Sequence, residues 1–418
     1  MKTTVPKDPY RVLFVASHPV QYAAPIFRQM ARNPQLNIQV AYCSLQGAEH
    51  GTDPEFGVEV KWDIPLLEGY PWVCVPNKSL RPGLARFFGL VNSGLWRLIR
   101  SGDFDAVVVY TGYVYVTFWI ALIAAKFYGS ALLFGTDAFV LAPRDGKKWK
   151  SVLKRLVWPW LFALANVVIV PSSRSFEMMR DLGIPNGRLT LTPYVVDNNW
   201  WTQHAQRVDR RAVRLGWRIP DAAPVVLFCA KLQPWKRPLD LLHAFAKANV
   251  PGAHLVYAGD GPLRSDAEML ATSLGIRKSV HFIGFANQSQ LPGVYSASDL
   301  LVLPSDYEPF GVVVNEAMLC GCAAVVSDHV GAGYDLVDAG SNGYLFPCGN
   351  VDALTEILRR VLTDRDKLAE MGQAARRRME TWSPRENIDA LISAVRTSAI
   401  QTSGHRSSQA PDQQLRLR

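Results

Sequence analysis

Short apolar runs alternate with helical patterns along most of the chain, and this alternation constrains the fold more than any other feature. Runs of this kind are typical of strands that are buried on both faces of a parallel sheet. The runs are 11–16, 36–44, 105–110, 131–135 and 167–170 in the first half, and 225–232, 254–259, 280–285, 299–304 and 323–327 in the second. Helical patterns cover 21–32, 113–128, 149–165 and 174–182. The sequence therefore predicts parallel sheets with helices on both faces.

A chain of 418 residues is too long for one hydrophobic core, so we expect two domains. Residues 197–223 separate the two series of runs; they are rich in Arg, Trp and Asp and contain no strand-like run. The predicted fold is α/β, with two Rossmann-like, doubly wound parallel-sheet domains that bind ligands in the cleft between them. The predicted segments are a first domain over 1–198, an interdomain linker over 199–223, a second domain over 224–380, a helix over 381–397 and a disordered polar tail over 398–418.

Composition and cysteine usage favour a cytoplasmic enzyme. The chain is 49% hydrophobic and 19% charged, which excludes general disorder, and its six cysteines show no disulfide-dense pattern. The first residues lack the apolar core of a signal peptide. Residues 107–125 carry no charge and are long enough to span a membrane, but the polar stretch from Tyr110 to Tyr115 predicts a strand, a loop and a buried helix instead.

Two glutamates mark the candidate ligand site. Glu308 follows an apolar run and lies on the loop before a predicted helix, and Glu316 lies inside that helix. The backbone N–H groups near Phe310, Gly311 and Val312 form a helix N-terminus that suits a phosphate. Carboxylates beside such a site repel phosphate but accept hydrogen bonds from hydroxyl groups. The arrangement fits a nucleotide-sugar, with a sugar and a ribose on either side of a diphosphate.

The spacing of Glu308 and Glu316 resembles the E-x7-E motif of retaining glycosyltransferases with the GT-B fold, family 4 type. The resemblance is strongest over 225–363. In that family a basic pair, usually Arg and Lys, follows the first strand of the second domain, and Lys231 and Lys236 occupy the matching positions. This chain departs from the family by having Lys231 in place of Arg and Arg237 in place of Gly.

The resemblance implies a role for each residue of the donor site. Lys231 and Lys236 would hold the diphosphate and stabilise the charge of the leaving group, while Glu316 would bind the ribose and Glu308 the donor sugar. Two further family elements concern the nucleoside: a glycine turn that includes Gly259, and a strand whose end, at Phe285, contacts the base. In the family the last helix, here 381–397, crosses back to the first domain.

The first domain offers fewer signals. His18 and Gln21 lie on the loop after the first apolar run. Three roles stay open for His18: a general base, a ligand of the acceptor, or an ordinary turn residue. Thr136 and Asp137 follow Gly135 at a strand end where many relatives have a donor-contacting His. They either bond sugar hydroxyls, or Asp137 caps the following turn.

No cofactor or metal is expected, because a nucleotide-sugar is a co-substrate and the sequence shows no His/Cys/Asp cluster at metal-ligand spacing. Asp103 and Asp105 spell the D-x-D of metal-dependent glycosyltransferases, but they are better explained as the start of a strand. A dehydrogenase is disfavoured because no G-x-G-x-x-G follows the first apolar run.

The net charge of +9 is concentrated partly beside aromatic residues. The basic residues are Arg144, Lys147, Lys148, Lys150, Lys154 and Arg155, and Trp158 and Trp160 follow them. This pattern suits the anionic inner face of a membrane, although a solvated helix face with its Trp side chains in the core explains it equally. Nucleic acid is not an expected partner, because no nucleic-acid-binding module is present.

The predicted function is transfer of a sugar, with retention of configuration, from a nucleoside-diphosphate sugar to an acceptor hydroxyl. The resemblance implies a metal-independent hexosyltransferase in glycan, polysaccharide or glycolipid biosynthesis, with a glycan or a lipid-linked acceptor. Two alternatives stay open: a nucleotide-sugar epimerase of related fold, and a catalytically silent nucleotide-sugar-binding protein.

Overall fold

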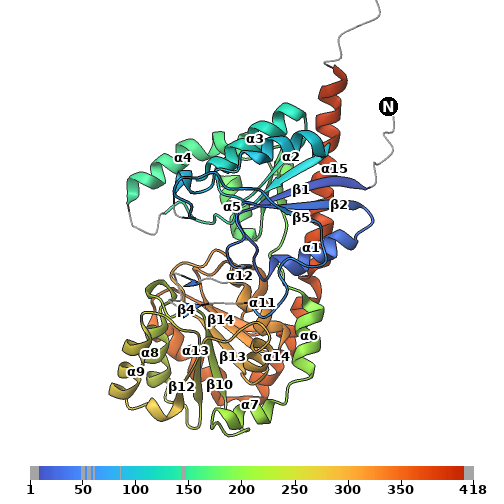
Figure 1. Cartoon of the computed structure of the whole chain (residues 1–418). Helices are drawn as coiled ribbons and strands as arrows, with labels where there is room; N and C mark the ends of the chain where they lie inside the picture. The colour runs from blue at the N-terminus through green and yellow to red at the C-terminus, as the bar shows by residue number, and fades with distance from the viewer. Residues whose placement is uncertain are drawn as a thin grey trace, which may run out of the picture.

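The computed structural model describes residues 9–48, 52–53, 58–59, 62–84, 86–142 and 147–408. Two α/β domains lie one above the other in Figure 1, with a seven-stranded sheet in the first and a six-stranded sheet in the second. Every neighbouring pair of strands within these two sheets is parallel. The predicted fold class is therefore confirmed.

The first sheet has the strand order β5-β2-β1-β6-β7-β8-β9. Its strands are β1 (Tyr10–Ala16), β2 (Leu36–Tyr42), β5 (Trp72–Cys74), β6 (Ala106–Val109), β7 (Ala131–Gly135), β8 (Val167–Val170) and β9 (Leu189–Leu191). Its helices are α1 (Ala23–Arg32), α2 (Gly94–Gly102), α3 (Val116–Tyr128), α4 (Lys148–Ala163) and α5 (Ser173–Asp181). The central strands are buried on both faces because helices cover each side, as continuous apolar runs require.

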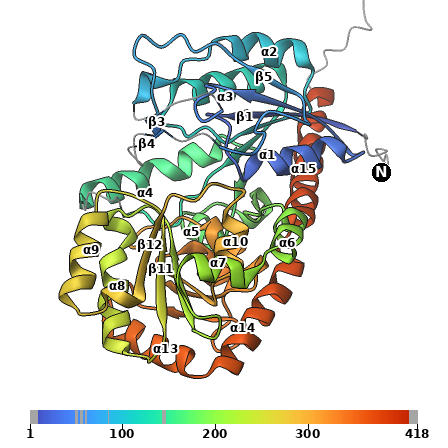
Figure 2. The ribbon, with the colours of Figure 1, turned by 60° about the horizontal axis from the view of Figure 1, so that its bottom comes forward.

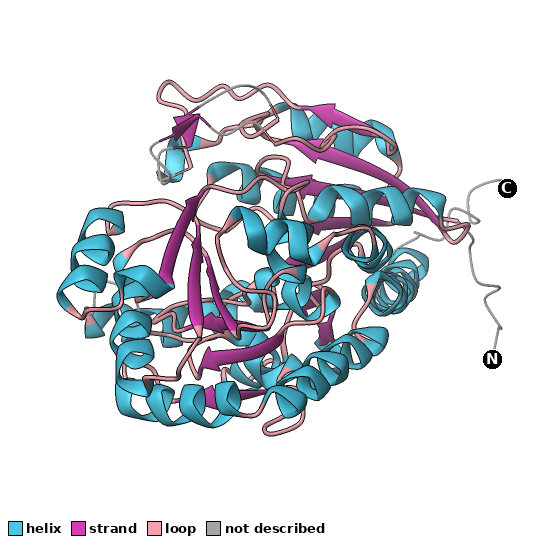
Figure 3. Cartoon of the chain, turned by 90° about the horizontal axis from the view of Figure 1, so that it is seen from below, coloured by secondary structure: helices cyan, strands magenta, loops and turns pink. Residues whose placement is uncertain are grey.

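The second sheet has the order β12-β11-β10-β13-β14-β15. Its strands are β10 (Val225–Cys229), β11 (His254–Ala258), β12 (Val280–Gly284), β13 (Leu300–Leu303), β14 (Ala323–Ser327) and β15 (Gly343–Phe346). The helices are α8 (Pro238–Ala248), α9 (Arg264–Ser273), α10 (Leu291–Ser296), α11 (Val312–Leu319), α12 (Gly331–Leu336), α13 (Val351–Thr363) and α14 (Arg365–Arg378). Figure 3 shows these helices on both sides of the sheet.

The strands that sequence reasoning missed lie at the edges of the sheets. β5, β9 and β15 have three or four residues each and pair with a strand on one side only, so they lack a long apolar run. A short antiparallel pair of β3 (Thr52–Asp53) and β4 (Val58–Glu59) also went unpredicted.

The stretch predicted as a linker, 199–223, is folded against the second domain. It contains most of α6 (Asn198–Gln206) and all of α7 (Arg210–Gly216). Arg214 of α7 is fully buried: its guanidinium donates to the carbonyl oxygens of Ala297 and Ala223 at 2.8 Å each, and to the Asp299 carboxylate at 2.9 Å. Asp299 also accepts from the backbone N–H of Val225 at 2.8 Å, so this ion pair fixes α7 to the start of β10.

The last helix, α15 (Pro384–Ser408), runs along the first domain, where it packs against β6, β7, β9 and α1 (Figure 1). The predicted disorder from residue 398 is wrong for residues 398–408, since the helix continues to Ser408. The hydroxyl groups of Thr397 and Ser398 donate to carbonyl oxygens four residues earlier, so these polar side chains are satisfied within the helix. Residues 409–418 lie outside the described part of the chain.

A cluster of aromatic side chains joins the two domains near the start of α15. The Phe310 ring, before α11, packs edge-on against Tyr194 of the first domain at 5.5 Å between centroids, and it stacks on Trp382 at 6.2 Å. The carbonyl oxygen of Tyr194 accepts from Trp382 Nε1 at 2.8 Å and from Asn315 Nδ2 at 3.0 Å. These contacts fix the first domain directly beside the N-terminus of α11.

Arg214→Met should lower the free energy of unfolding by about 3–5 kcal/mol, because it leaves a buried carboxylate and several carbonyl oxygens short of a donor. The neighbouring Arg211→Met is the matched control: Arg211 pairs with Asp221 at 3.0 Å but its side chain is 83% exposed, so the loss should be at most about 1 kcal/mol. Urea unfolding followed by tryptophan fluorescence measures both. Equal losses in the two variants would contradict the role given to Arg214.

Candidate functional site

The loop after β13 carries Glu308 and is tied to the loop after β14. The backbone N–H of Glu308 donates to the carbonyl oxygen of His329 at 3.3 Å, and the N–H of Gly331 donates to the Glu308 carbonyl oxygen at 3.0 Å. The Glu308 carboxylate forms an ion pair with Lys236. Two residues that the sequence assigned to one site are therefore in direct contact, and both side chains are mostly buried.

Gly311 begins α11 in a conformation that favours glycine. Its φ is 96°, and a Cβ atom at this position would lie 3.1 Å from Glu308 Cγ and 3.2 Å from Val330 Cγ1. The glycine therefore permits Glu308 to lie against the N-terminus of α11. Phe310 on one side of it is buried, and Val312 on the other is the first helical residue.

Lys236 is the last residue of a short 3₁₀ turn, Pro234–Lys236, and Arg237 follows it. Arg237 has the left-handed conformation, with φ 49°, which explains why glycine is usual at this position in the family that the sequence resembles. Its guanidinium donates to Asp240 at 2.7 Å, an ion pair that helps to hold the strained residue in place. Lys231 lies at the end of β10 and is partly exposed.

Glu316 is buried in α11 and accepts a hydrogen bond from the Tyr295 hydroxyl at 2.8 Å. Burial raises the pKa of this carboxyl to about 8, and the hydrogen bond from Tyr295 only partly opposes the shift. The carboxyl is therefore neutral at neutral pH in the protein without ligand. Tyr295, which the sequence did not indicate, also lies 3.4 Å from Cys229 at the end of β10.

Trp62 and Asp63 of the first domain contact the segment that follows β12 in the second domain. The Trp62 ring lies edge-on to Phe285, with 6.3 Å between centroids. The Asp63 carboxylate accepts from the backbone N–H of Ser289 at 3.2 Å and also from its hydroxyl group. Nearby, Gly259 lies so close to the preceding strand that a Cβ atom would be 2.1 Å from the Ala230 carbonyl oxygen. The glycine turn is thus required by the packing of two strand ends, whatever ligand lies above them.

A cavity of about 500 Å³ opens at the carboxyl ends of β1, β6 and β7 in the first domain. Its lining is rich in aromatic and polar side chains, among them Ser17, His18, Tyr22, Tyr110, Tyr113, Thr136, Asp137, Lys154, Trp158, Tyr194 and Tyr307. Three residues predicted from the sequence, His18, Thr136 and Asp137, therefore share one cavity. Gln21, the fourth, is partly exposed and does not line it.

The aromatic wall of this cavity explains why residue 135 is a glycine. A Cβ atom at Gly135 would lie 2.4 Å from a ring carbon of Tyr110, so the Tyr110 ring takes the place of a side chain there. Thr136 accepts from the backbone N–H of Ala138 at 3.3 Å, and Asp137 is exposed at the cavity. No motif on the sequence pointed to Tyr110, which lies just past the end of β6.

The cavity reaches the glutamate loop of the second domain. Tyr307, the residue before Glu308, lines it, and its ring packs against Phe139 at 5.2 Å. Burial raises the pKa of Tyr22 to about 12, with further contributions from the charges of Asp137 and Glu308, so these carboxylates of opposite domains lie near one phenol. The His18 imidazole bonds to the Ser17 hydroxyl at 3.0 Å, and burial lowers the pKa of His18 below its ordinary value of 6.5. It is therefore neutral at pH 7.

Asp103 and Asp105, the residues of the D-x-D pattern, have structural roles. Asp103 caps the end of α2 with φ 45°, and Asp105 accepts from the backbone N–H of Arg11 at 2.9 Å, so both act in the fold and away from the cavity. Asp335 of α12 accepts from the backbone N–H of Ser173 at 3.1 Å, across the domain boundary.

Among the described residues, the fold brings together potential metal ligands that the spacing in the sequence did not reveal. The fold brings Asp306, His329 and Cys348 together at the carboxyl ends of β13, β14 and β15, with ligand atoms within 4.8 Å of one another. They escaped sequence reasoning because they are 23 and 42 positions apart.

Comparisons with known proteins identify the family and the fold. Residues 209–378 match the glycosyl transferases group 1 family, and residues 22–195 match the glycosyl transferase 4-like domain family. The chain is 37% identical over 147 residues to an uncharacterized glycosyltransferase of Methanocaldococcus jannaschii, covering 35% of this chain and 37% of that protein. It is 33% identical over 201 residues to the D-inositol 3-phosphate glycosyltransferase of Rhodococcus erythropolis, covering 46% and 45%. The chain thus spans less than half the length of these curated relatives.

Solved structures share the whole fold at low identity. Anabaena HepE in complex with UDP and glucose has a TM-score of 0.67 at 20% identity, with 96% of this chain and 100% of that chain covered. WaaG, a glycosyltransferase involved in lipopolysaccharide biosynthesis, has a TM-score of 0.60 at 18% identity, with coverage of 90% and 98%.

Glu316→Gln should stabilise the protein near pH 8 more than near pH 5. The pKa of Glu316 in the folded protein is raised above its ordinary value of 4.5, so the neutral carboxyl contributes stability at low pH that is lost as the pH rises to about 8. Glutamine cannot ionise and escapes this loss. Urea unfolding of both proteins from pH 5 to 8.5 measures the difference, with Glu370→Gln on the surface of α14 as the control. A difference that does not grow with pH would contradict the buried, neutral state of Glu316.

Proposed function

This chain belongs to the GT-B glycosyltransferases of the family 4 type, and we propose that it transfers a sugar from a nucleoside-diphosphate sugar to an acceptor hydroxyl with retention of configuration. The observation that carries the proposal is the contact between Lys236 and Glu308 at the carboxyl ends of the second sheet. A cation and a carboxylate at this point match the two halves of such a donor, the diphosphate and the sugar.

Donor binding would exchange the partners of this ion pair. The diphosphate takes Lys236, together with Lys231 at the end of β10, and the hydroxyl groups of the donor sugar take Glu308. Lys236 exchanges a carboxylate for another anion, and Glu308 exchanges the ammonium group for hydrogen bonds from hydroxyl groups, so neither is left buried without a partner. Glu316 accepts the ribose hydroxyls as a carboxylate, and because it is neutral before binding, nucleotide binding is coupled to the loss of its proton.

The acceptor would enter the aromatic cavity of the first domain. Tyr110, Tyr113 and Trp158 offer flat apolar faces to a sugar ring, while Thr136 and Asp137 offer hydrogen-bonding groups. His18 is neutral and lines the same cavity, which suits a residue that accepts a proton or a hydrogen bond from an acceptor hydroxyl. Tyr307 connects this cavity to the Glu308 loop, where the donor sugar would lie.

The working mechanism is a substitution on one face of the sugar. The acceptor hydroxyl attacks from the side on which the diphosphate departs, and the departing phosphate oxygen takes its proton. Lys231 and Lys236 neutralise the charge that develops on the leaving group, which is the role that a metal ion has in metal-dependent transferases. We therefore propose that the reaction is metal-independent.

Lys231→Ala and Lys236→Ala should each reduce turnover as well as donor affinity, with a loss of about 2 kcal/mol or more at the transition state. Lys278→Ala, an exposed lysine on another part of the second domain, is the matched control and should leave turnover unchanged. A screen of nucleoside-diphosphate sugars with mass detection first identifies the donor, beginning with UDP-sugars because HepE was solved with UDP and glucose. Turnover at saturating donor is then measured for each variant.

Three results would contradict this assignment. Turnover like that of the wild type in both lysine variants would remove the proposed leaving-group stabilisation. Release of an isomerised nucleotide-sugar without any acceptor would indicate an epimerase. A requirement for added Mg²⁺ or Mn²⁺ would contradict the metal-independent mechanism.

We further propose that the enzyme binds anionic membranes reversibly through α4. The exposed side of this helix carries Trp149, Val152, Leu153, Leu156, Val157 and Trp160, and the last of these is 80% exposed. Trp158, Leu161 and Phe162 face the core. The helix therefore has one apolar face toward the core and a second one toward solvent. An exposed apolar face with Lys148, Lys150 and Arg155 on the same helix is the pattern of an interfacial helix.

The position of α4 suits this role. It lies at the outer edge of the first domain in Figure 1, and Lys154 and Trp158 of the same helix line the acceptor cavity. A membrane under α4 would bring a lipid-linked acceptor to the mouth of that cavity. Among the described residues no helix combines the length and the apolar character needed to cross a bilayer. Arg144, part of the predicted basic run, lies outside the described residues.

Replacing Lys147, Lys148 and Lys150 by Glu should abolish sedimentation with anionic vesicles, since each basic residue near such a surface contributes about 1 kcal/mol. Trp160→Ala should weaken sedimentation without changing its dependence on salt. The control exchanges the same number of charges on α14 in the second domain (Arg365, Lys367 and Arg377 to Glu), and it should sediment like the wild type. Binding by the wild type should fall as salt rises. Equal sedimentation with neutral and anionic vesicles, or none with either, would rule the proposal out.

A further inference from the structure

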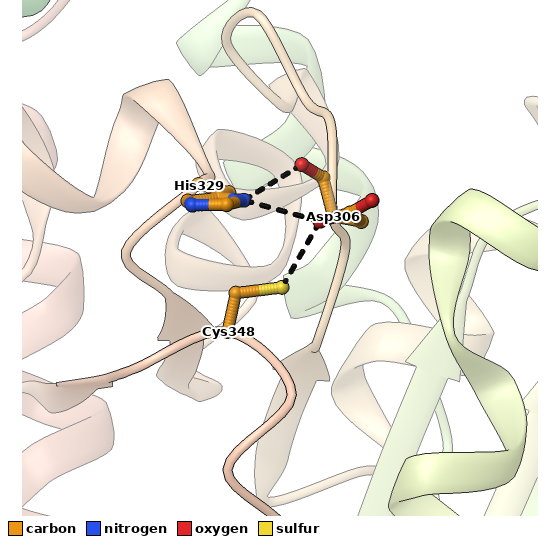
Figure 4. Close-up of side chains that lie close together, drawn as sticks. All are labelled: Asp306, His329 and Cys348. Atoms are coloured by element: carbon orange, nitrogen blue, oxygen red, sulfur yellow. Dashed lines mark hydrogen bonds and ion pairs between the residues drawn. The ribbon is translucent and has the colours of Figure 1, made fainter. Parts of the chain in front are cut away.

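We propose that Asp306, His329 and Cys348 form a zinc site at the edge of the second sheet. The three residues follow β13, β14 and β15, which are neighbours in the sheet, so the parallel strands deliver them to one edge. Figure 4 shows the three side chains pointing toward one another. Nothing in the glycosyl transfer derived above uses this cluster.

The distances fit a tetrahedral ion. His329 Nδ1 lies 3.3 Å from Asp306 Oδ1, and Cys348 Sγ lies 3.5 Å from the same oxygen. With metal bonds of about 2.1 Å to N and O and about 2.3 Å to S, the edges of a tetrahedron are about 3.4 Å between N and O and about 3.6 Å between S and O. Two of the three separations thus match the edges of a tetrahedron, and the third pair of ligand atoms, on Cys348 and His329, lies within 4.8 Å.

The ligand types select the ion. A thiolate with an imidazole and one carboxylate suits Zn²⁺, whereas Mg²⁺ and Ca²⁺ prefer sites made of oxygen ligands alone. Three protein ligands leave a fourth position open, and the exposure of Asp306 and His329 gives it to water. Besides the three proposed ligands, the charged side chains near Cys348 are those of Asp328 and Arg237. Arg237 is already paired with Asp240.

Contacts behind the cluster hold the ligands in position. The Asp328 carboxylate accepts from the backbone N–H of Cys348 at 2.8 Å. The Ser327 hydroxyl accepts from the backbone N–H of His329 at 3.3 Å and donates to the Ser305 carbonyl oxygen at 2.6 Å. Such supporting bonds fix the direction of ligands at metal sites. His329 Nδ1 also lies 2.8 Å from the Asp306 carbonyl oxygen, a hydrogen bond that the ion would replace.

The site adjoins both loops of the donor site. The backbone N–H of Asp306 donates to the Trp235 carbonyl oxygen at 2.7 Å, one residue before Lys236, and Glu308 follows Asp306 by two residues. An ion that ties Asp306 to the loops after β14 and β15 would therefore hold the segments that carry Lys236 and Glu308. The site stiffens the donor loops and takes no part in the bond-breaking step.

Calorimetric titration of the untagged full-length protein with Zn²⁺ tests the site at neutral pH. The wild type should bind one ion, and Cys348→Ser and His329→Ala should each reduce the affinity at least about tenfold. Cys74→Ser, on the first domain, is the matched control and should bind like the wild type. Titration with Co²⁺ adds a direct reading of the thiolate, whose charge-transfer absorption should appear in the wild type and in Cys74→Ser but be absent from Cys348→Ser.

Hydrogen exchange tests the consequence for the donor loops. Zn²⁺ should slow amide exchange over residues 234–237 and 304–311 in the wild type and leave Cys348→Ser unchanged, while the melting temperature without metal shows that the variant is folded. The proposal is overturned if the wild type binds no Zn²⁺, if Cys348→Ser binds it with wild-type affinity, or if exchange in these segments does not respond to the ion. None of these readings depends on transferase activity, so they are independent of the proposed function.

Discussion

The contact of Phe310 with Tyr194 and Trp382 fixes the geometry on which the rest of the structure depends. Phe310 precedes Gly311 at the start of α11, so the aromatic cluster positions the same turn that places Glu308. The Tyr194 carbonyl oxygen, with donors from Trp382 and Asn315, holds the first domain against that turn. The Glu308 loop and the aromatic cavity therefore meet at a packed junction of three aromatic rings. Trp382 lies just before α15, the helix that runs beside α1 of the first domain in Figure 2.

The charged groups of the candidate site are compensated within the protein. Lys236 and Glu308 neutralise each other, and Glu316 keeps its proton because burial disfavours the carboxylate. In the proposed function a nucleotide-sugar would satisfy all three groups at once. The same logic holds outside the site, where Arg214 is buried only because Asp299 and three carbonyl oxygens surround its guanidinium.

The two domains contribute different chemistry to the cleft. The second supplies cations and carboxylates on short loops after parallel strands, and the first supplies an aromatic cavity of about 500 Å³. The connections between them are also distributed: Asp63 bonds to Ser289, and Asp335 bonds to Ser173. Each half of the proposed site lies at the carboxyl ends of its own sheet, so the proposed reacting centre forms only where the two domains meet.

The sequence by itself determined the fold class, because apolar runs alternating with helical patterns leave few arrangements other than parallel sheets. It also indicated Glu308 and Glu316 from the strand and helix patterns around them, and Lys236 through the family resemblance. Only the tertiary structure decided the features that depend on residues distant in the sequence. The Tyr110 ring fills the space of a side chain at Gly135, and burial keeps Glu316 protonated. The cluster of Asp306, His329 and Cys348 likewise forms only in the folded chain. The edge strands and the end of α15 escaped for a related reason. Their stability comes from pairing and packing with distant segments, and a local pattern of residues does not contain that information.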